Sequence, residues 1–380
     1  MIVGKYIQDH MLNIPKEDWQ IINEQYTPEQ IKQNIVDHIQ CGDIETPYIQ
    51  YTEQEFEDLF RRFCDTPTEG VQTSEQCYAA LKYKYPVTNK YFQGNQKFNG
   101  VSNYFQQENR WQCGSVRKSG RSPYEEFHNA HIYYGYLNYL YTMKCQKVGR
   151  LELRQTMSLR GYIASQFRPA IAKEIYEYFG AKDVLDLSSG WGDRLAGFYA
   201  ANCTRSYIGI DPNPKTWQIY HKQAEAYSKL TTPKKVHFIN KPAEDVQLPE
   251  AIVDMVFTSP PYFNTEMYDK DSAKKENQSF ARYNSVQRWM EGFLKPTLRM
   301  AYKALKPGGI MAINIADVTI GKNQRYNVCD DMNDFIKDEL GMKWVDEIGM
   351  RMSQRPNSNR YNGQGTVLVE PIWIWRKPEN

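Results

Sequence analysis

The sequence has little that would mark a secreted, membrane or metal-binding protein. Its seven cysteines are scattered singly and never spaced Cys-x-x-Cys, so neither a disulfide framework nor a thiolate zinc site is indicated. No run approaches the ~18 apolar residues of a membrane span, and the start, MIVGKYIQDHML, lacks the apolar core of an export signal. The one close histidine pair, His128 and His131, has no further ligand nearby. We therefore expect a cytoplasmic protein without metal or membrane partner.

The length of the chain and its pattern of apolar residues indicate a globular protein of two regions. A chain of 380 residues, 41% hydrophobic and 24% charged, can enclose full cores. Up to about residue 155 the pattern is helical, and after residue 180 short apolar runs alternate with helical segments, as in a parallel α/β sheet. We predict a mainly helical region at 1–155, which either recognises the substrate or forms a lid, and an α/β domain at 156–380.

The helical region carries local start signals. Thr27 with Gln30, and Thr52 with Glu55, have the spacing of capping boxes ahead of apolar stripes. The segment EEFHNAHIYYGYLNYLYTMKC predicts one long aromatic helix over residues 125–145.

Charge is unevenly distributed along the chain although the net charge is only +2. Residues 1–80 carry 5 basic and 15 acidic side chains, whereas residues 81–160 carry 13 basic and 4 acidic ones. The basic block interleaves aromatic residues, a combination that binds phosphates and stacks on bases. Nucleic-acid binding and packing of the basic segment against the acidic one are both open interpretations.

Seven apolar runs predict the strands of the α/β domain. The last two are separated only by the polar loop SQRPNSNRYNGQG, which predicts an antiparallel hairpin. In such sheets the ligand lies beyond the carboxyl ends of the strands, so site residues are expected there. The runs cover residues 183–188, 206–211, 236–240, 252–259, 309–317, 342–350 and 366–375.

The first strand leads into a loop with two glycines, SSGWG. Gly190 and Gly192 allow the backbone to approach a ligand closely, and the following helix directs its positive end there. Asp211 ends the second strand, where a carboxylate can accept both hydroxyls of a ribose, and Asp245 follows the third, where it can meet an adenine amine. The pattern fits NAD and S-adenosyl-L-methionine (AdoMet), but the loop lacks the GxGxxG spacing of a dinucleotide site.

The fourth strand ends in the stiff corner FTSPPYF. Ser259 and the carbonyl of Pro260 offer two fixed acceptors, and the ring of Tyr262 offers a flat surface. Two acceptors suit a group with two N–H donors, and a flat ring suits a stacked base. Such contacts favour the pyramidal nitrogen with an available lone pair in methyl transfer to an exocyclic amine. The alternative is a proline corner that only ends a strand.

At TSPPY the sequence resembles AdoMet-dependent amino-methyltransferases of DNA, and the Ser-Pro-Pro-Tyr form is typical of enzymes that make N4-methylcytosine. The resemblance covers about residues 160–376 and implies the class I methyltransferase fold, a Rossmann-like seven-stranded, mostly parallel sheet with an antiparallel last strand. It implies AdoMet as cofactor and a catalytic role for residues 156–380. The nucleophilic cysteine of C5-cytosine chemistry is absent, because position 261 is proline.

The resemblance assigns site residues by position. The catalytic motif comprises Ser259, Pro260, Pro261 and Tyr262. The cofactor residues comprise Gln166, Arg168 and Pro169 at the methionine end, Asp186, Ser188, Gly190 and Gly192 on the loop, and Asp211 and Asp245 at the ribose and adenine. Phe263 is expected to contact substrate. Arg355 and Arg360 of the polar hairpin loop are expected to do so as well, and a solvated loop is the alternative for these two.

The sequence thus predicts a site-specific DNA methyltransferase acting on an exocyclic amine, with cytosine N4 favoured over adenine N6. The partner is DNA, single- or double-stranded. The alternatives are methylation of RNA or of a protein amide, and a nucleic-acid-binding module without activity. Loss of AdoMet binding would support the last of these.

Overall fold

The computed structural model describes residues 2–79, 81–115, 118–263, 265–268, 278–320, 324–352 and 366–379. The chain forms two compact units. Unit 1 comprises Met1–Tyr51, Gln107–Ser165 and Glu266–Lys270, and unit 2 comprises Thr52–Gln106, Gln166–Thr265 and Asp271–Asn380. This division differs from the single boundary expected at residue 155, because Thr52–Gln106 contributes strands to the sheet of unit 2.

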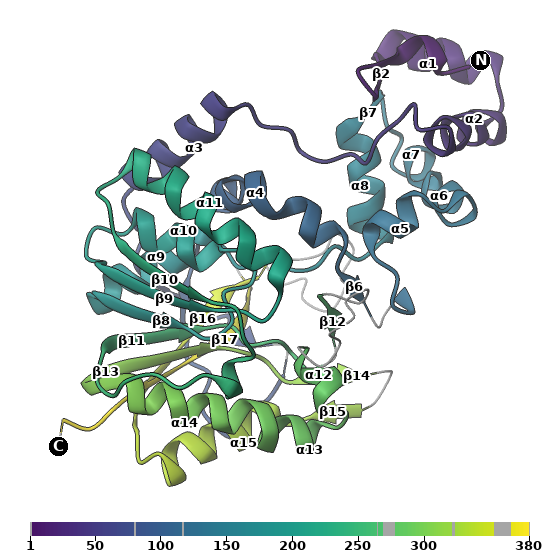
Figure 1. Cartoon of the computed structure of the whole chain (residues 1–380). Helices are drawn as coiled ribbons and strands as arrows, with labels where there is room; N and C mark the ends of the chain where they lie inside the picture. The colour runs from purple at the N-terminus through teal and green to yellow at the C-terminus, as the bar shows by residue number, and fades with distance from the viewer. Residues whose placement is uncertain are drawn as a thin grey trace. The chain divides into compact units, whose positions relative to one another are not determined.

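Unit 2 is built on a mixed sheet whose central strands run in the order β10-β9-β8-β11-β13-β17-β16. Figure 1 shows β10, β9, β8, β11 and β13 in succession. The first five are parallel, and β17 is antiparallel to both β13 and β16. This order and the closing hairpin confirm the predicted class I methyltransferase sheet. The strands are β8 (Asp183–Asp186), β9 (Ser206–Ile210), β10 (Lys235–Ile239), β11 (Val253–Thr258), β13 (Leu305–Asn314), β16 (Lys343–Arg351) and β17 (Val367–Arg376).

Three short strands from the N-terminal half extend this sheet. Strand β5 (Lys90–Phe92) pairs parallel to β16, β3 (Val71–Thr73) pairs antiparallel to β5, and β4 (Cys77–Ala79) pairs with β17. Strand β5 gives a backbone partner to β16, and β3 gives one to β5, so that neither β16 nor β5 is an open edge of the sheet. We did not predict the three short strands from the sequence, because strands of three residues have too few positions to show a period.

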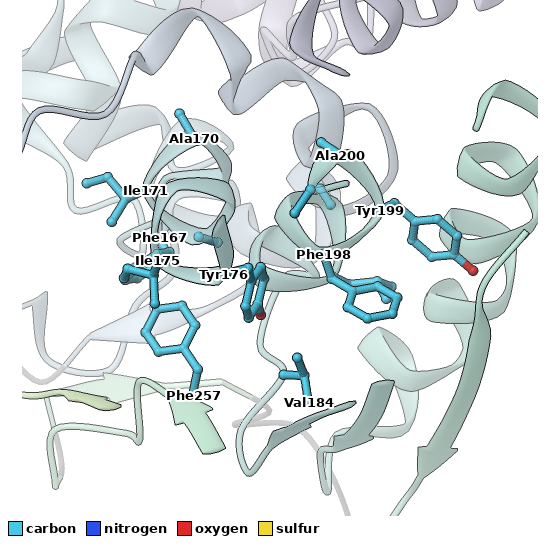
Figure 2. Packing of buried hydrophobic residues seen from close by; sticks show 14 of the residues in the cluster. Phe167, Ala170, Ile171, Ile175, Tyr176, Val184, Phe198, Tyr199, Ala200 and Phe257 are labelled. Atoms are coloured by element: carbon cyan, nitrogen blue, oxygen red, sulfur yellow. The ribbon is translucent and has the colours of Figure 1, made fainter. Parts of the chain in front are cut away.

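Helices cover both faces of the sheet (Figure 1). On one face, α9, α10 and β-strand side chains form a core that includes Ile175, Tyr176, Val184, Phe198 and Phe257 (Figure 2). On the other, a second core contains Trp289, Leu298, Met311, Trp373 and Trp375. The helices of unit 2 are α3 (Glu53–Asp65), η2 (Gln96–Asn99), α9 (Pro169–Phe179), α10 (Asp193–Ala200), α11 (Pro214–Leu230), η4 (Ala243–Asp245), α12 (Ser279–Arg282), α13 (Val286–Trp289), η6 (Met290–Leu294), α14 (Lys295–Ala304), α15 (Val328–Asp334) and η7 (Phe335–Glu339). A short hairpin joins β14 (Val318–Ile320) and β15 (Gln324–Tyr326).

Unit 1 is helical with its own apolar core, which includes Trp19, Ile35, Trp111 and Leu153. Its elements are η1 (Gly4–Tyr6), α1 (Lys16–Gln25), α2 (Pro28–Gln40), α5 (Pro123–Phe127), α6 (Ala130–Tyr136), α7 (Asn138–Thr142), α8 (Arg150–Arg160) and the short strands β1 (Ile7–Gln8), β2 (Met11–Ile14), β6 (Gly114–Ser115), β7 (Val148–Gly149) and β12 (Glu266–Met267). Helix α4 (Gly100–Trp111) begins in unit 2 and ends in unit 1.

Local signals decide the helix starts. The capping boxes predicted at Thr27 and Thr52 are present at the starts of α2 and α3. The single long helix predicted over residues 125–145 is wrong, since this segment forms three short helices. The side chain of Asn129 accepts a hydrogen bond from the Ile132 amide and starts a new helix there, because asparagine competes with the helical backbone for donors.

No helix in the described part of the chain is both long and apolar enough to cross a membrane. Among the same residues, no group of three or more histidine, cysteine, aspartate or glutamate side chains is arranged to hold a metal ion. All seven cysteines are free thiols, and Cys113 and Cys329 are buried.

Candidate active site

The carboxyl ends of the parallel strands bring the predicted residues of unit 2 to one edge of the sheet. Strand β11 lies between β8 and β13, so its end at Thr258 is flanked by Asp186 of β8 and Asn314 of β13. The register pairs Thr258 with Ile313. The proline corner therefore begins beside the last residue of β13 and in the same sheet as the glycine loop.

Hydrogen bonds fix the hydroxyl of Ser259. Its Oγ donates to Asn314 Oδ1 at 3.3 Å, and Asn314 Nδ2 donates to the carbonyl of Pro371 at 3.1 Å. Asn314 is 1% exposed, whereas Ser259 is partly exposed. The corner thus presents a partly exposed hydroxyl that is oriented from behind by a buried amide.

Tyr262 is held through its phenol. The hydroxyl donates to Glu370 Oε1 at 2.6 Å, and Glu370 lies on β17 next to Pro371. Burial and the nearby negative charge of Glu370 raise the pKa of Tyr262 well above its ordinary value, so the phenol stays protonated. The ring is therefore fixed at both ends, by the backbone of the corner and by its hydroxyl.

The other residues of the corner differ in exposure. Pro260 is buried and Pro261 is partly exposed. Phe263, which we expected to contact substrate, is only 6% exposed and packs with Trp289 and Tyr326. Its φ of 50° turns the chain after Tyr262, and its side chain belongs to the core of this face. A buried aromatic anchor explains its position better than a substrate contact.

The glycine loop has the backbone geometry that only glycine adopts readily. Gly190 and Gly192 have φ values of 57° and 74°. A Cβ at Gly190 would make only ordinary contact, whereas a Cβ at Gly192 would lie 2.4 Å from the amide of Gln223. Gly190 therefore leaves room on its side of the loop, and Gly192 is required by the packing of α11 against the start of α10.

Asp186 lies behind this loop. It is fully buried and accepts from Arg194 Nε at 2.7 Å and from the hydroxyl of Tyr207 at 2.7 Å. Arg194 also donates to the carbonyl of Ser188, which is itself partly exposed. The ion pair thus fixes the loop backbone from inside, and Asp186 has its hydrogen-bonding capacity directed at protein groups.

Asp211 connects the second strand to the glycine loop. It accepts from the Gly190 amide at 2.8 Å, from the Asn213 amide at 2.9 Å and from the Tyr220 hydroxyl at 3.1 Å. It is 8% exposed, and burial raises its pKa to about 6. A ligand that donates hydroxyl hydrogens here would stabilise the charged carboxylate that burial disfavours.

The residues expected at the methionine end lie on the chain entering α9. Gln166 Nε2 donates to Asp193 Oδ1 and to Ser102 Oγ, both at 2.8 Å. Arg168, 9% exposed, donates to the carbonyl of Gln93 at 3.1 Å. Burial lowers the pKa of Arg168. Pro169 is buried at the first position of α9.

Asp245, the expected adenine contact, is engaged by an arginine. Both carboxylate oxygens accept from Arg282, at 2.6 and 2.9 Å, and Arg282 also reaches Glu244 at 3.1 Å. The carboxylate side chain remains 44% exposed. Arg355 and Arg360 lie outside the described residues.

These observations test whether AdoMet fits. Three groups follow the neighbouring strands β8, β9 and β10 in that order: the loop backbone at Gly190, the carboxylate of Asp211 and the exposed side of Asp245. Gly190 leaves room for a ligand, and the two carboxylates can accept from hydroxyl and amine groups. Asp186 and Gln166 contribute by holding the loop. The group therefore fits, with fewer direct ligands than the sequence led us to expect.

Sequence reasoning missed several residues that shape this edge. Asn314 and Glu370 hold the corner, and each had a signal, since each is a polar residue inside an otherwise apolar strand sequence. Ser102 and Arg194 hold the glycine loop from behind, and nothing in their local sequence indicated it.

Comparison with known families identifies the part of the chain that carries the corner. Residues 253–380 match the family model N6_N4_Mtase, described as DNA methylase. No curated protein matches the chain.

Solved structures match parts of the chain at low similarity. An N-methyltransferase, NodS, from Bradyrhizobium japonicum is 11% identical, with 56% of this chain and 94% of that chain covered and a TM-score of 0.34. A candidate DNA modification methylase from Thermus thermophilus is 22% identical, with 37% and 52% covered and a TM-score of 0.27. TrmN, also from Thermus thermophilus, is 16% identical, with 56% and 49% covered and a TM-score of 0.35. These values do not bear on the substrate.

The family match includes the end of β11, the proline corner and the closing hairpin, about a third of the chain. Through residues 253–380, the chain is similar to the DNA methylase family that the model N6_N4_Mtase describes.

Proposed function

We propose that this chain methylates an exocyclic amino group of DNA, with cytosine N4 favoured over adenine N6. The observation that carries the proposal is the Ser-Pro-Pro-Tyr corner at the end of β11, with the Ser259 hydroxyl and the Tyr262 ring both held by hydrogen bonds. Serine in the first position favours cytosine, whereas aspartate or asparagine there is usual for adenine.

The roles of the chain's own residues follow from this geometry. Ser259 Oγ and the Pro260 carbonyl accept the two N–H groups of the amine, and Tyr262 stacks on the base. The glycine loop with Asp211 and Asp245 holds AdoMet, which supplies a methyl group on a positively charged sulfur. Two acceptors on the amine draw its hydrogens out of the base plane and free the lone pair. The acidic proton of the methylated amine then passes to water.

A base paired in a duplex cannot reach a corner at a sheet edge, so the target nucleotide must be unpaired or flipped out, at a cost of a few kcal/mol. In unit 1, residues 107–165 carry nine basic and four acidic side chains. This excess supports substrate recognition, rather than lid formation, as the role of that segment. Binding should then weaken steeply between about 50 and 200 mM salt.

The test is to incubate the protein with methyl-labelled AdoMet and duplex DNA, single-stranded DNA or RNA, then to identify the labelled nucleoside by mass spectrometry. We expect N4-methylcytosine from DNA, and a loss of most of the label in Ser259→Ala. Ser228→Ala, on α11, is a matched control, because this hydroxyl also makes a side-chain hydrogen bond, to Tyr199 at 3.1 Å.

The outcomes separate the alternatives. Label in N6-methyladenine would keep the chemistry and correct the base, and label in RNA alone would change the substrate. Binding of AdoMet without label in any nucleic acid would overturn the DNA assignment and redirect the test to protein amides.

A further inference from the structure

The orientation of the Asn314 side chain is determined by its surroundings. Its Nδ2 lies 3.1 Å from the Pro371 carbonyl, an acceptor, and its Oδ1 lies 3.3 Å from Ser259 Oγ. The flipped amide would place two oxygens against each other at Pro371, inside a site where Asn314 is 1% exposed. The amide oxygen therefore faces Ser259.

This orientation decides what Ser259 can do. An amide oxygen accepts and cannot donate, so the Ser259 hydroxyl must be the donor in this contact. The phenol of Tyr262 also interacts with Ser259, and its own proton is donated to Glu370 at 2.6 Å. The Tyr262 phenol therefore does not donate to Ser259, and the hydrogen bond of the serine hydroxyl directs its proton to Asn314.

We propose that Asn314 is a positioning residue for methyl transfer: by taking the Ser259 proton, it leaves only lone pairs of Ser259 Oγ to face the substrate amine. This inference rests on the proposed function. A serine whose proton is free to rotate can donate to the amine nitrogen and engage the lone pair that must attack. With Asn314 in place, that unproductive hydrogen bond is suppressed.

The same arrangement limits the substrate and the product. Two acceptors with no donor, Ser259 Oγ and the Pro260 carbonyl, require a primary amine with two N–H groups. A singly methylated amine has one N–H left and would leave one acceptor without a donor, which costs free energy in a desolvated site. The corner therefore selects primary amines and stops after one methyl group.

A double-mutant cycle tests this role. Asn314→Ala should lower kcat on the order of tenfold, corresponding to a lost hydrogen bond of about 1.4 kcal/mol, without changing the Kd for AdoMet measured by calorimetry. In the Ser259→Ala background, Asn314→Ala should lower the residual kcat no further, because no serine proton remains to be oriented. Mass spectrometry should find no dimethylated nucleoside with the wild-type protein.

Asn333→Ala is the matched control. Asn333 is as deeply buried, accepts from Trp375 Nε1 at 3.1 Å and lies in the same unit on α15. It should lower the thermal midpoint as Asn314→Ala does and leave kcat unchanged. A second variant guards against loss of folding: Asn314→Asp keeps an acceptor toward Ser259 and can donate to Pro371 only when protonated, so its kcat at saturating AdoMet should recover toward low pH.

The outcomes are distinct. Equal kcat in Asn314→Ala and wild type, losses that multiply in the double variant, or dimethylated product would each overturn the inference while the proposed function stands. Absence of label in every nucleic acid with the wild-type protein would overturn the proposed function, and this inference with it.

Discussion

We predict that Asp211 makes the affinity for the cofactor depend on pH. Its carboxylate is 8% exposed and burial raises its pKa to about 6, although two backbone amides and Tyr220 donate to it. If the ribose hydroxyls of the cofactor donate to the charged form, binding requires an ionised Asp211. The apparent Kd then rises as pH falls through 6, and it should be roughly tenfold weaker at pH 5 than at pH 7.

Calorimetric titration with S-adenosylhomocysteine between pH 5 and 7 measures this directly, because neither end of that ligand titrates in the window. Asp211→Asn cannot ionise, so its Kd should be weaker at pH 7 and independent of pH. A wild-type Kd that stays constant from pH 5 to 7, or an equal slope in Asp211→Asn, would refute the assignment of Asp211 to the ribose.

Substitutions at three further residues test contacts in the site and in the sheet that carries it. Tyr262→Phe keeps the ring but removes the hydroxyl that donates to Glu370 at 2.6 Å, so the rate of methylation should fall on the order of tenfold. Tyr262→Ala should lower the rate further. Equal rates in Tyr262→Phe and wild type would show that the hydroxyl does not position the ring. Burial raises the pKa of Glu347 to about 8, so the folded state holds this proton more tightly than the unfolded chain does. The free energy of unfolding should therefore fall as pH rises from about 4.5 through 8. Glu347→Gln should reduce this fall in denaturant titrations at several pH values, and an unchanged dependence of the free energy of unfolding on pH would contradict the prediction. Gly192→Ala should lower the free energy of unfolding by about 1–3 kcal/mol, because the new Cβ would lie 2.4 Å from the Gln223 amide and the residue would have a positive φ. Adding Gln223→Ala to this variant should restore part of the lost stability in thermal melts. An unchanged melting temperature in Gly192→Ala would show that the loop adapts.

The sheet could be predicted because buried parallel strands are nearly continuous apolar runs. Each run named from the sequence, from 183–188 to 366–375, overlaps one strand of the structure. The single helix over residues 125–145 was predicted wrongly. The spacing of apolar residues does not show that the Asn129 side chain accepts from the Ile132 amide and so starts a new helix there. The strands β3, β4 and β5 are too short for a period, and their stability comes from pairing with distant segments.

The location of the candidate site in the fold could be predicted from the sequence, whereas the contacts of its side chains could be predicted less well. The positions of Ser259, Gly190 and Asp211 follow from strand ends, which the sequence marks. Which atoms a side chain meets depends on residues far along the chain. Asp186, assigned to the cofactor by resemblance, instead pairs with the buried Arg194, since an ion in that interior needs a counter-charge.

The hairpin of β16 and β17 explains how the corner keeps its geometry. Tyr262 is held by Glu370, and Ser259 is held through Asn314 by the carbonyl of the next residue, Pro371. A proline inside a central strand cannot donate to the ladder, but its carbonyl remains free to accept from a side chain. Because consecutive residues of β17 hold the partners of Ser259 and Tyr262, we expect a displacement of β17 to move both side chains together. The anchors of the two side chains, Glu370 and the Pro371 carbonyl, are therefore adjacent on one strand.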